Sequence, residues 1–87
     1  MPKIIGIKVQ EGTSKKTGNP YRAVIVHYVD NFPPKSDGVG NMADNQFVDR
    51  DTFDTALEGR AMQDVIGKEC SFFYTKGGFL SEMVIED

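Results

Sequence analysis

Cysteine and histidine, the residue types that most often carry covalent or acid–base chemistry, occur once each among the 87 residues of the chain. His27 lies between alternating apolar residues of an expected strand, where a structural or surface histidine is far more common than a catalytic base. Cys70 lies in an apolar segment, where a thiol is usually a small core hydrophobe rather than a nucleophile. We therefore expect no catalytic residue and no enzymatic activity.

Metal and cofactor sites are not expected either. One histidine and one cysteine cannot supply the ligands of a zinc site. A run of four aspartates from Asp49 to Asp64 offers oxygen ligands for a hard cation. Its spacing matches no calcium loop, so a solvated helix face explains it better. The segment Gly38-Val39-Gly40 has loop composition without a phosphate-binding motif around it. The sequence thus predicts neither a metal nor a cofactor.

Lysines and aromatic residues beside expected turns offer better material for binding. Lys15 and Lys16 lie in a glycine-flanked loop, where their side chains can move. Mobile cations follow the backbone of single-stranded nucleic acid, and exposed rings stack on its bases whatever their identity. Tyr21, at a strand entrance, and Phe79, directly after Gly77-Gly78, are the rings that we expect to be exposed. The expected nucleic-acid-binding residues are Lys8, Lys15, Lys16, Tyr21, Arg22, Tyr74, Lys76 and Phe79.

The charge distribution bears on the hypothesis of nucleic-acid binding and also favours a second class of function. The formal net charge is −3, which argues against a surface coated uniformly for nucleic acid. Residues 1–28 hold five basic residues and one acidic residue, a net charge of +4, whereas residues 29–87 carry −7. A basic and an acidic face are therefore expected. The acidic part is typical of a different class of function, a small protein–protein interaction module whose acidic helical face docks on a basic partner.

Five strands and one helical stretch are expected to position these residues. Ile5 and Ile7 alternate with glycine and lysine, which predicts a half-buried strand, and Gly6 between them indicates a bulge or sharp bend. Gly59 divides the helical stretch, which predicts a short helix with a break or two short pieces. Asp51 or Thr52 is the expected helix cap. The expected segments are strands over 3–10 and 21–30, irregular structure over 31–44, a short strand over 45–49, the helical stretch up to residue 67, and strands over 69–75 and 79–85.

This order of elements predicts the fold class. Five short antiparallel strands with one helix between the third and the fourth are typical of an OB-type barrel. We expect an all-β chain with one short helical segment, a single five-stranded antiparallel OB-like barrel domain over residues 1–87. An SH3-like barrel and an open α+β sheet are the alternatives. Tyr28 and Tyr74 are evenly balanced between core and surface. The expected core residues are Ile5, Ile7, Val9, Val24, Val26, Phe72 and Val84, with residues 53–66 closing one end.

Two motifs in the chain carry a family resemblance. Lys16-Thr17-Gly18-Asn19-Pro20-Tyr21 runs on to Tyr28-Val29-Asp30, and near the other end stands Gly77-Gly78-Phe79-Leu80-Ser81-Glu82-Met83. In order and separation they resemble the loop-to-strand segment and the last hairpin of the filamentous-phage single-stranded-DNA-binding, or helix-destabilising, proteins. The resemblance implies an OB fold that coats single-stranded DNA as cooperative homodimers.

The same resemblance implies roles for individual residues. It implies phosphate contacts at Lys15 and Lys16, and a base contact at Tyr21. It also implies that Phe79 stacks on a base from the last hairpin. Asn19 stands where the family has a lysine, which removes one phosphate contact. An acidic loop and a helical stretch replace the hairpin that the family uses for dimer contacts.

The expected location follows from what the chain lacks. It has no long apolar run, no signal-peptide pattern at its start and no pair of cysteines, which predicts the cytoplasm, here of a bacterial host cell, and no membrane partner. The expected function is single-stranded DNA binding without strong sequence preference, in the replication of a phage or mobile element. The partner is single-stranded nucleic acid, with DNA favoured over RNA, and a homodimer is expected from the resemblance.

Overall fold

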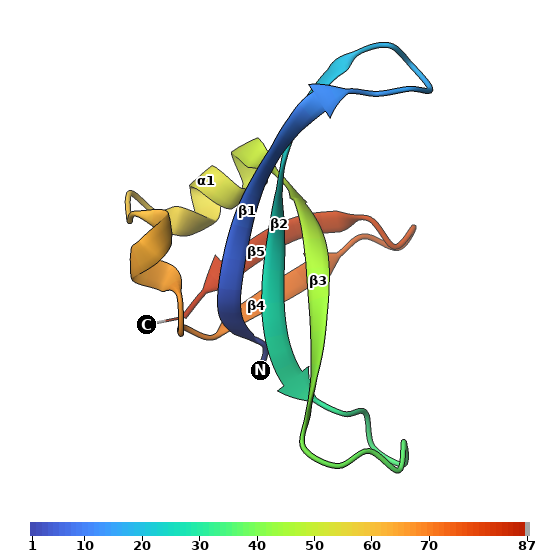
Figure 1. Ribbon diagram of the computed structural model, residues 1–87, viewed down its shortest axis with the longest axis vertical. Coiled ribbons are helices and arrows are strands. Elements are labelled where there is room, and N and C mark those ends of the chain that lie inside the picture. Colours follow the sequence, from blue (N-terminus) through green and yellow to red (C-terminus); the bar gives the residue numbers. More distant parts are fainter. Residues whose placement is uncertain (87) are drawn as a thin grey trace.

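The structure, a computed structural model, describes residues 1–86. Its elements are the strands β1 (Lys3–Thr13), β2 (Pro20–Asn31) and β3 (Asn41–Asp49), the helix α1 (Arg50–Leu57), the 3₁₀ helix η1 (Met62–Val65), and the strands β4 (Cys70–Tyr74) and β5 (Leu80–Ile85). β1, β2 and β3 form an antiparallel sheet in that order, and β4 pairs with β5 in a second sheet (Figure 1). The expected β-rich chain with one short helix between the third and fourth strands is confirmed.

Three strands are longer than the sequence predicts, and β2 gains one residue at each end. β1 continues to Thr13, because its last residues still pair with β2 as far as Pro20. β3 begins at Asn41, so the prediction of irregular structure up to residue 44 is wrong from Asn41 onward. Asn41–Asp44 is polar and has little strand propensity of its own. Pairing with β2 therefore extends it, as often happens when tertiary context outweighs local preference.

Helix α1 begins earlier than expected and ends where expected. Asp49, rather than Asp51 or Thr52, is the cap, since its carboxylate accepts a hydrogen bond from the backbone N–H of Asp51 at 3.1 Å. The chain leaves the helix through Glu58 and Gly59, which have φ angles of 53° and 84°, and glycine adopts that conformation readily. Because η1 follows as a separate piece, the expected break at Gly59 is confirmed.

One face of the β1–β3 sheet packs against α1 and the β4–β5 sheet to form the core. Val24 and Val26 point into it, as expected, and Phe53 of α1 is fully buried there. Between the two sheets, the rings of Tyr28 and Phe72 lie 5.4 Å apart and are tilted to one another. The buried core residues are Ile4, Val24, Val26, Val48, Phe53, Ala56, Leu57, Val65, Cys70, Met83 and Ile85.

The β1 side chain that enters the core is not the expected one. The register between β1 and β2 shifts between Ile4 and Gly6, which makes Ile5 the extra residue of a β-bulge. Ile4 is fully buried, whereas Ile5 is 50% exposed. The bulge predicted at Gly6 is confirmed, but the placement of Ile5 in the core is wrong because the bulge interrupts the alternation of the strand.

Two further core predictions are wrong in part. Val9 is 41% exposed, since it lies on the part of β1 that extends beyond the core. Val84 is only partly buried, because β5 instead turns its neighbours Met83 and Ile85 inward. Ile7 and Leu80 pack at the margin of the core.

Within the described chain, the two sheets are not closed into one ladder. On one side, the start of β1 pairs with the start of β4, where the N–H of Ile4 donates to the carbonyl of Lys68 at 2.9 Å and the N–H of Cys70 donates to the carbonyl of Pro2 at 2.8 Å. On the other side, β3 and β5 have no ladder between them. The five expected strands are therefore present, but they form a three-stranded and a two-stranded sheet.

Candidate functional site

The face of the β1–β3 sheet that points away from the core carries a row with one exposed lysine and one exposed ring. The register places Lys8, Ile25 and Phe47 opposite one another across the three strands. Directly paired residues point to the same side of a sheet, and the adjacent Val24 and Val48 point into the core. The row therefore faces outward. We term this surface the outer sheet face, comprising Lys8, Tyr21, Ile25, His27, Phe47 and Asp49, with the buried Ala23 between Tyr21 and Ile25.

Tyr21 is held on the outer sheet face by its neighbours on β1. It pairs with Gly12, where an added Cβ would stand 3.1 Å from the Tyr21 hydroxyl oxygen and 3.3 Å from its ring. Glycine thus leaves the room that the ring occupies. The side-chain amide of Gln10 donates a hydrogen bond to the hydroxyl at 3.2 Å. Tyr21 is 36% exposed, which confirms the predicted partial exposure.

The loop between β1 and β2 presents Lys15 and Lys16, both exposed. Backbone hydrogen bonds of 2.8 Å close the base of this loop. Neither lysine forms an ion pair with another residue of the described chain. Glu11, the nearest acidic residue in sequence, is instead paired with Arg22, whose Nε lies 3.2 Å from its Oε1. Both ammonium groups are therefore available to an anion.

Arg22 lies apart from the other expected residues of this hairpin. It follows Tyr21 directly in β2, so its side chain points to the opposite face of the sheet, the side of Val24. Its ion pair with Glu11 spans the two strands on that face. The structure thus separates Arg22 from the outer sheet face.

The β4–β5 hairpin carries the remaining expected residues. Phe79 is 76% exposed, which confirms the predicted exposure. Its ring lies against Gly77, where an added Cβ would stand 3.3 Å from it. Tyr74 is 52% exposed, and its hydroxyl donates a hydrogen bond to Oε1 of Gln46 on β3 at 2.7 Å. Lys76 is exposed in the turn between these two rings.

The expected residues therefore form two groups rather than one. Figure 1 shows the tips of the β1–β2 and β4–β5 hairpins pointing away from the molecule in different directions. Among residues 1–86, no hydrogen bond or ion pair joins a side chain of one tip to a side chain of the other. β3 connects the two regions, because Phe47 belongs to the outer sheet face and the adjacent Gln46 bonds to Tyr74.

Phe47 was not predicted from the sequence as a surface ring. It is 51% exposed and shares its row with Lys8 and Ile25. The signal that points to it is the pair Phe47-Val48, two consecutive apolar residues in a strand, of which one must face outward if only one side of the sheet is covered. Which of the two does so depends on the pairing of β3 with β2.

A shallow hollow of about 350 Å³ adjoins Tyr21 on the side of α1. Arg22 and Arg50 contribute to its lining, but so do Asp49 and Asp51. Carboxylates repel phosphate, so this hollow suits a nucleic-acid backbone less well than the loop of Lys15 and Lys16 does.

The residues with potential covalent chemistry lie as predicted. Cys70 is fully buried, and this burial raises the pKa of its thiol to about 11. His27 lies on the outer sheet face. In the part of the chain that the structure describes, no group of three His, Cys, Asp or Glu side chains could hold a metal ion. No helix there is both long enough and apolar enough to cross a membrane.

Comparison with known proteins adds no relative to this picture. No protein-family model, curated protein or solved structure matches the chain. The candidate site is therefore defined by its geometry, as two exposed hairpins that flank an outward-facing sheet with rings and lysines.

Proposed function

We propose that this protein binds single-stranded nucleic acid, DNA in preference to RNA, without strong sequence preference. The observation that carries the proposal is the combination on one hairpin of the Tyr21 ring, positioned over Gly12, with the unpaired Lys15 and Lys16. Exposed rings take bases and mobile lysines take phosphates, and neither contact depends on base identity. The motif resemblance supports DNA as the partner.

The proposal includes an OB-like arrangement of the chain. The order of the strands, the helix between β3 and β4, and the pairing of β1 with the start of β4 support it. In OB folds, the face of the second and third strands and the loops of the first and last hairpins bind oligonucleotides. Here those positions hold the outer sheet face, Lys15 and Lys16, and Phe79.

A path for the bound strand follows from these positions. One base stacks on Tyr21 while Lys15 and Lys16 neutralise phosphates. The strand continues over Phe47, with Lys8 in the same row. Phe79, Tyr74 and Lys76 form a second platform on the other hairpin. The path avoids the face of Arg22, where Glu11 already holds the guanidinium group.

The biological setting remains part of the proposal and rests on the resemblance. It comprises helix destabilisation in the replication of a phage or mobile element, a homodimer, and a location in the cytoplasm of a bacterial host cell. The acidic stretch of the chain does not follow the family's pattern for dimer contacts.

The test is binding of labelled oligo(dT), compared with a duplex of equal length and with oligo(rU), at low and moderate salt. We expect tighter binding of oligo(dT) than of either competitor, and affinity that falls as salt rises. Equal binding of the duplex would indicate a purely electrostatic contact and contradict the role of the rings. Absence of binding at low salt would contradict the proposal as a whole.

A second candidate function has an observation in its favour. Helix α1 presents the exposed Asp51 and Asp54 at i, i+3 spacing, with Asp54 paired to Arg50, and the exposed Glu58 follows directly after the helix. This agrees with the alternative of a protein–protein interaction module with an acidic helical face. The two functions occupy different surfaces, so both can belong to one domain.

A further inference from the structure

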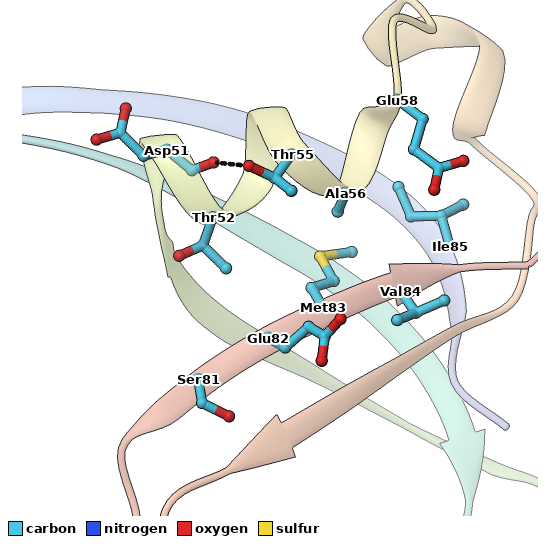
Figure 2. A pocket seen from close by; sticks show the side chains of 10 residues that line it. All are labelled: Asp51, Thr52, Thr55, Ala56, Glu58, Ser81, Glu82, Met83, Val84 and Ile85. Atoms are coloured by element: carbon cyan, nitrogen blue, oxygen red, sulfur yellow. Dashed lines mark hydrogen bonds between the residues drawn. The ribbon is translucent and has the colours of Figure 1, made fainter.

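A groove of about 310 Å³ lies between helix α1 and strand β5 (Figure 2). Its floor is formed by Ala56 on the helix and Met83 and Ile85 on the strand, which are almost fully buried, and the partly buried Val84 also lines it. At the helix side, Thr52 points toward β5. The groove lies at the lower end of the ~300–1,000 Å³ range of ligand pockets, which suits one or two side chains of a partner better than a whole folded element.

Carboxylates border this apolar floor. Asp51 and Glu58 lie at the two ends of α1, and Glu82 lies on β5. All three are exposed. Asp51 and Glu82 form no ion pair with any residue from 1 to 86, whereas Glu58 has a long contact of 3.9 Å with Arg60. No lysine or arginine lines the groove, so the electrostatic potential in the groove favours a cation.

We propose that the groove binds an extended segment of a partner protein that carries lysine or arginine next to an apolar side chain. The apolar side chain enters the groove above Ala56 and Met83, and the cation lies at the carboxylate border of the groove. Charge complementarity selects this occupant. Nucleic acid would bring phosphates toward three carboxylates, and a second copy docked groove to groove would bring the same carboxylates together.

This inference does not depend on the proposed nucleic-acid function; it rests on the second candidate function, whose acidic helical face it extends to a groove and a class of partner. None of the groove residues belongs to the rings and lysines of the two hairpins. The protein would thus bind nucleic acid on its basic hairpins and a basic protein segment on its acidic groove.

The test uses the full chain and a short fluorescent peptide of alternating lysine and valine, with a glutamate–valine peptide as the control probe. Two-dimensional NMR of the isotope-labelled chain locates binding. We expect the lysine peptide to shift the amide signals of Thr52, Ala56 and Glu82 and to leave those of Lys15 and Tyr21 in place. The glutamate peptide should shift none of them.

Variants then test the chemistry of the groove. Asp51→Asn with Glu82→Gln should weaken binding about 2- to 30-fold at low salt, the change that corresponds to two exposed ion pairs. Asp64→Asn removes an exposed carboxylate outside the groove and should leave affinity unchanged. Thr52→Arg should abolish binding, because it places a cation and its stem in the groove. Circular dichroism of each variant confirms that it is folded.

Several results would overturn the proposal. Shifts confined to the hairpins, or equal binding of the double variant, would show that the peptide binds elsewhere. Groove shifts on addition of oligo(dT) would make the groove a nucleic-acid surface. Concentration-dependent groove shifts without peptide, together with a dimer in sedimentation, would make a second copy the occupant.

Discussion

The hydroxyl of Tyr74 donates a 2.7 Å hydrogen bond to the side-chain oxygen of Gln46, and this contact joins the β4–β5 sheet to β3. The side-chain amide nitrogen of Gln46 donates a hydrogen bond to the backbone carbonyl of Phe47 at 2.9 Å. Both the oxygen and the nitrogen of this amide therefore form hydrogen bonds. The contact lies on the side of the molecule where β3 and β5 have no ladder between them. Among residues 1–86, this side-chain hydrogen bond therefore joins β3 to the β4–β5 sheet, and no backbone ladder joins β3 to that sheet.

Loss of this hydrogen bond should have a small, measurable cost. Tyr74→Phe keeps the ring and removes only the hydroxyl, so we expect the free energy of unfolding in urea to fall by about 0.5–1.5 kcal/mol, the usual value of one hydrogen bond. Tyr21→Phe, which loses a longer bond to the exposed side chain of Gln10, is the matched control and should cost less. An unchanged free energy for Tyr74→Phe would show that the two sheets do not need this link.

The β-bulge in β1 predicts opposite behaviour of two adjacent isoleucines. Ile4→Ala should destabilise the protein by about 2–5 kcal/mol, because Ile4 is fully buried. Ile5→Ala should cost well under that, since half of its side chain is already exposed. Because the Ile4→Ala variant loses a large part of a stability margin of about 5 kcal/mol, Ile4→Val provides a milder comparison, at about 0.5–1.5 kcal/mol. Equal losses at both positions in urea denaturation would contradict the register.

The stacking rings can be tested by truncation. Tyr21→Ala, Phe79→Ala and Phe47→Ala should each weaken oligo(dT) binding by about 1–3 kcal/mol, the usual value of one base–aromatic stack. Tyr21→Phe should keep most of the affinity because the ring is retained. The chain has no tryptophan, so tyrosine emission should be quenched on binding and report the affinity directly.

Two controls apply to these variants. Val39→Ala changes a side chain that is 94% exposed in the β2–β3 loop and should leave binding unaltered. Circular dichroism must show that each alanine variant is folded. If folded variants bind as tightly as the parent, the rings do not form the platform.

The lysines of the β1–β2 loop should govern the salt dependence of binding. Each lysine that neutralises a phosphate of a single strand contributes about 0.7 to the steepness of log K against log salt concentration. Replacing both Lys15 and Lys16 with alanine should therefore reduce the slope by about 1.4 for every oligonucleotide. Lys35→Gln, in the β2–β3 loop, is the control and should leave the slope as it is. An unchanged slope in the double variant would show that the loop is not on the path of the strand.

The buried thiol predicts a loss of stability at alkaline pH. Burial raises the pKa of Cys70 to about 11, above its ordinary value of 9.0, so the folded chain holds this proton more tightly than the unfolded chain does. The stability that follows is fully present below pH 9.0 and is lost as the pH rises toward 11. The free energy of unfolding in urea should fall with rising pH in the parent. In Cys70→Ala it should fall less steeply with pH. In agreement with its burial, Cys70 should react with a thiol reagent at pH 8 only after unfolding.

Local signals in the sequence predicted the features that depend on a few neighbouring residues. The break at Gly59 follows from the low helix propensity of glycine, and the exposure of Tyr21 and Phe79 follows from their places beside proline and glycine turns. The burial of Cys70 follows from the apolar run around it. Each of these features is decided within one turn or one strand.

The predictions that were wrong, and the features that were not predicted, concern pairing between segments distant in the sequence. A single-residue shift of register decides that Ile4 rather than Ile5 enters the core. The early start of β3 at Asn41 and the outward direction of Phe47 depend in the same way on β2. Whether β3 and β5 share a ladder depends on how the two sheets are oriented, and no residue in either strand encodes this alone. The separation of Arg22 from the lysines likewise follows from the alternation of β2.

The junction between β1 and β4 has a consequence for the synthesis of the chain. Pro2 and Ile4 form backbone hydrogen bonds with Gly67, Lys68 and Cys70, so the start of β1 completes its pairing only when a segment translated much later is present. Until then, the side chain of Ile4 is not covered by β4. The start of β1 also has an unpaired edge, with which neighbouring polypeptides can pair. A stall in translation between β3 and β4 would prolong the time for which this edge stays open.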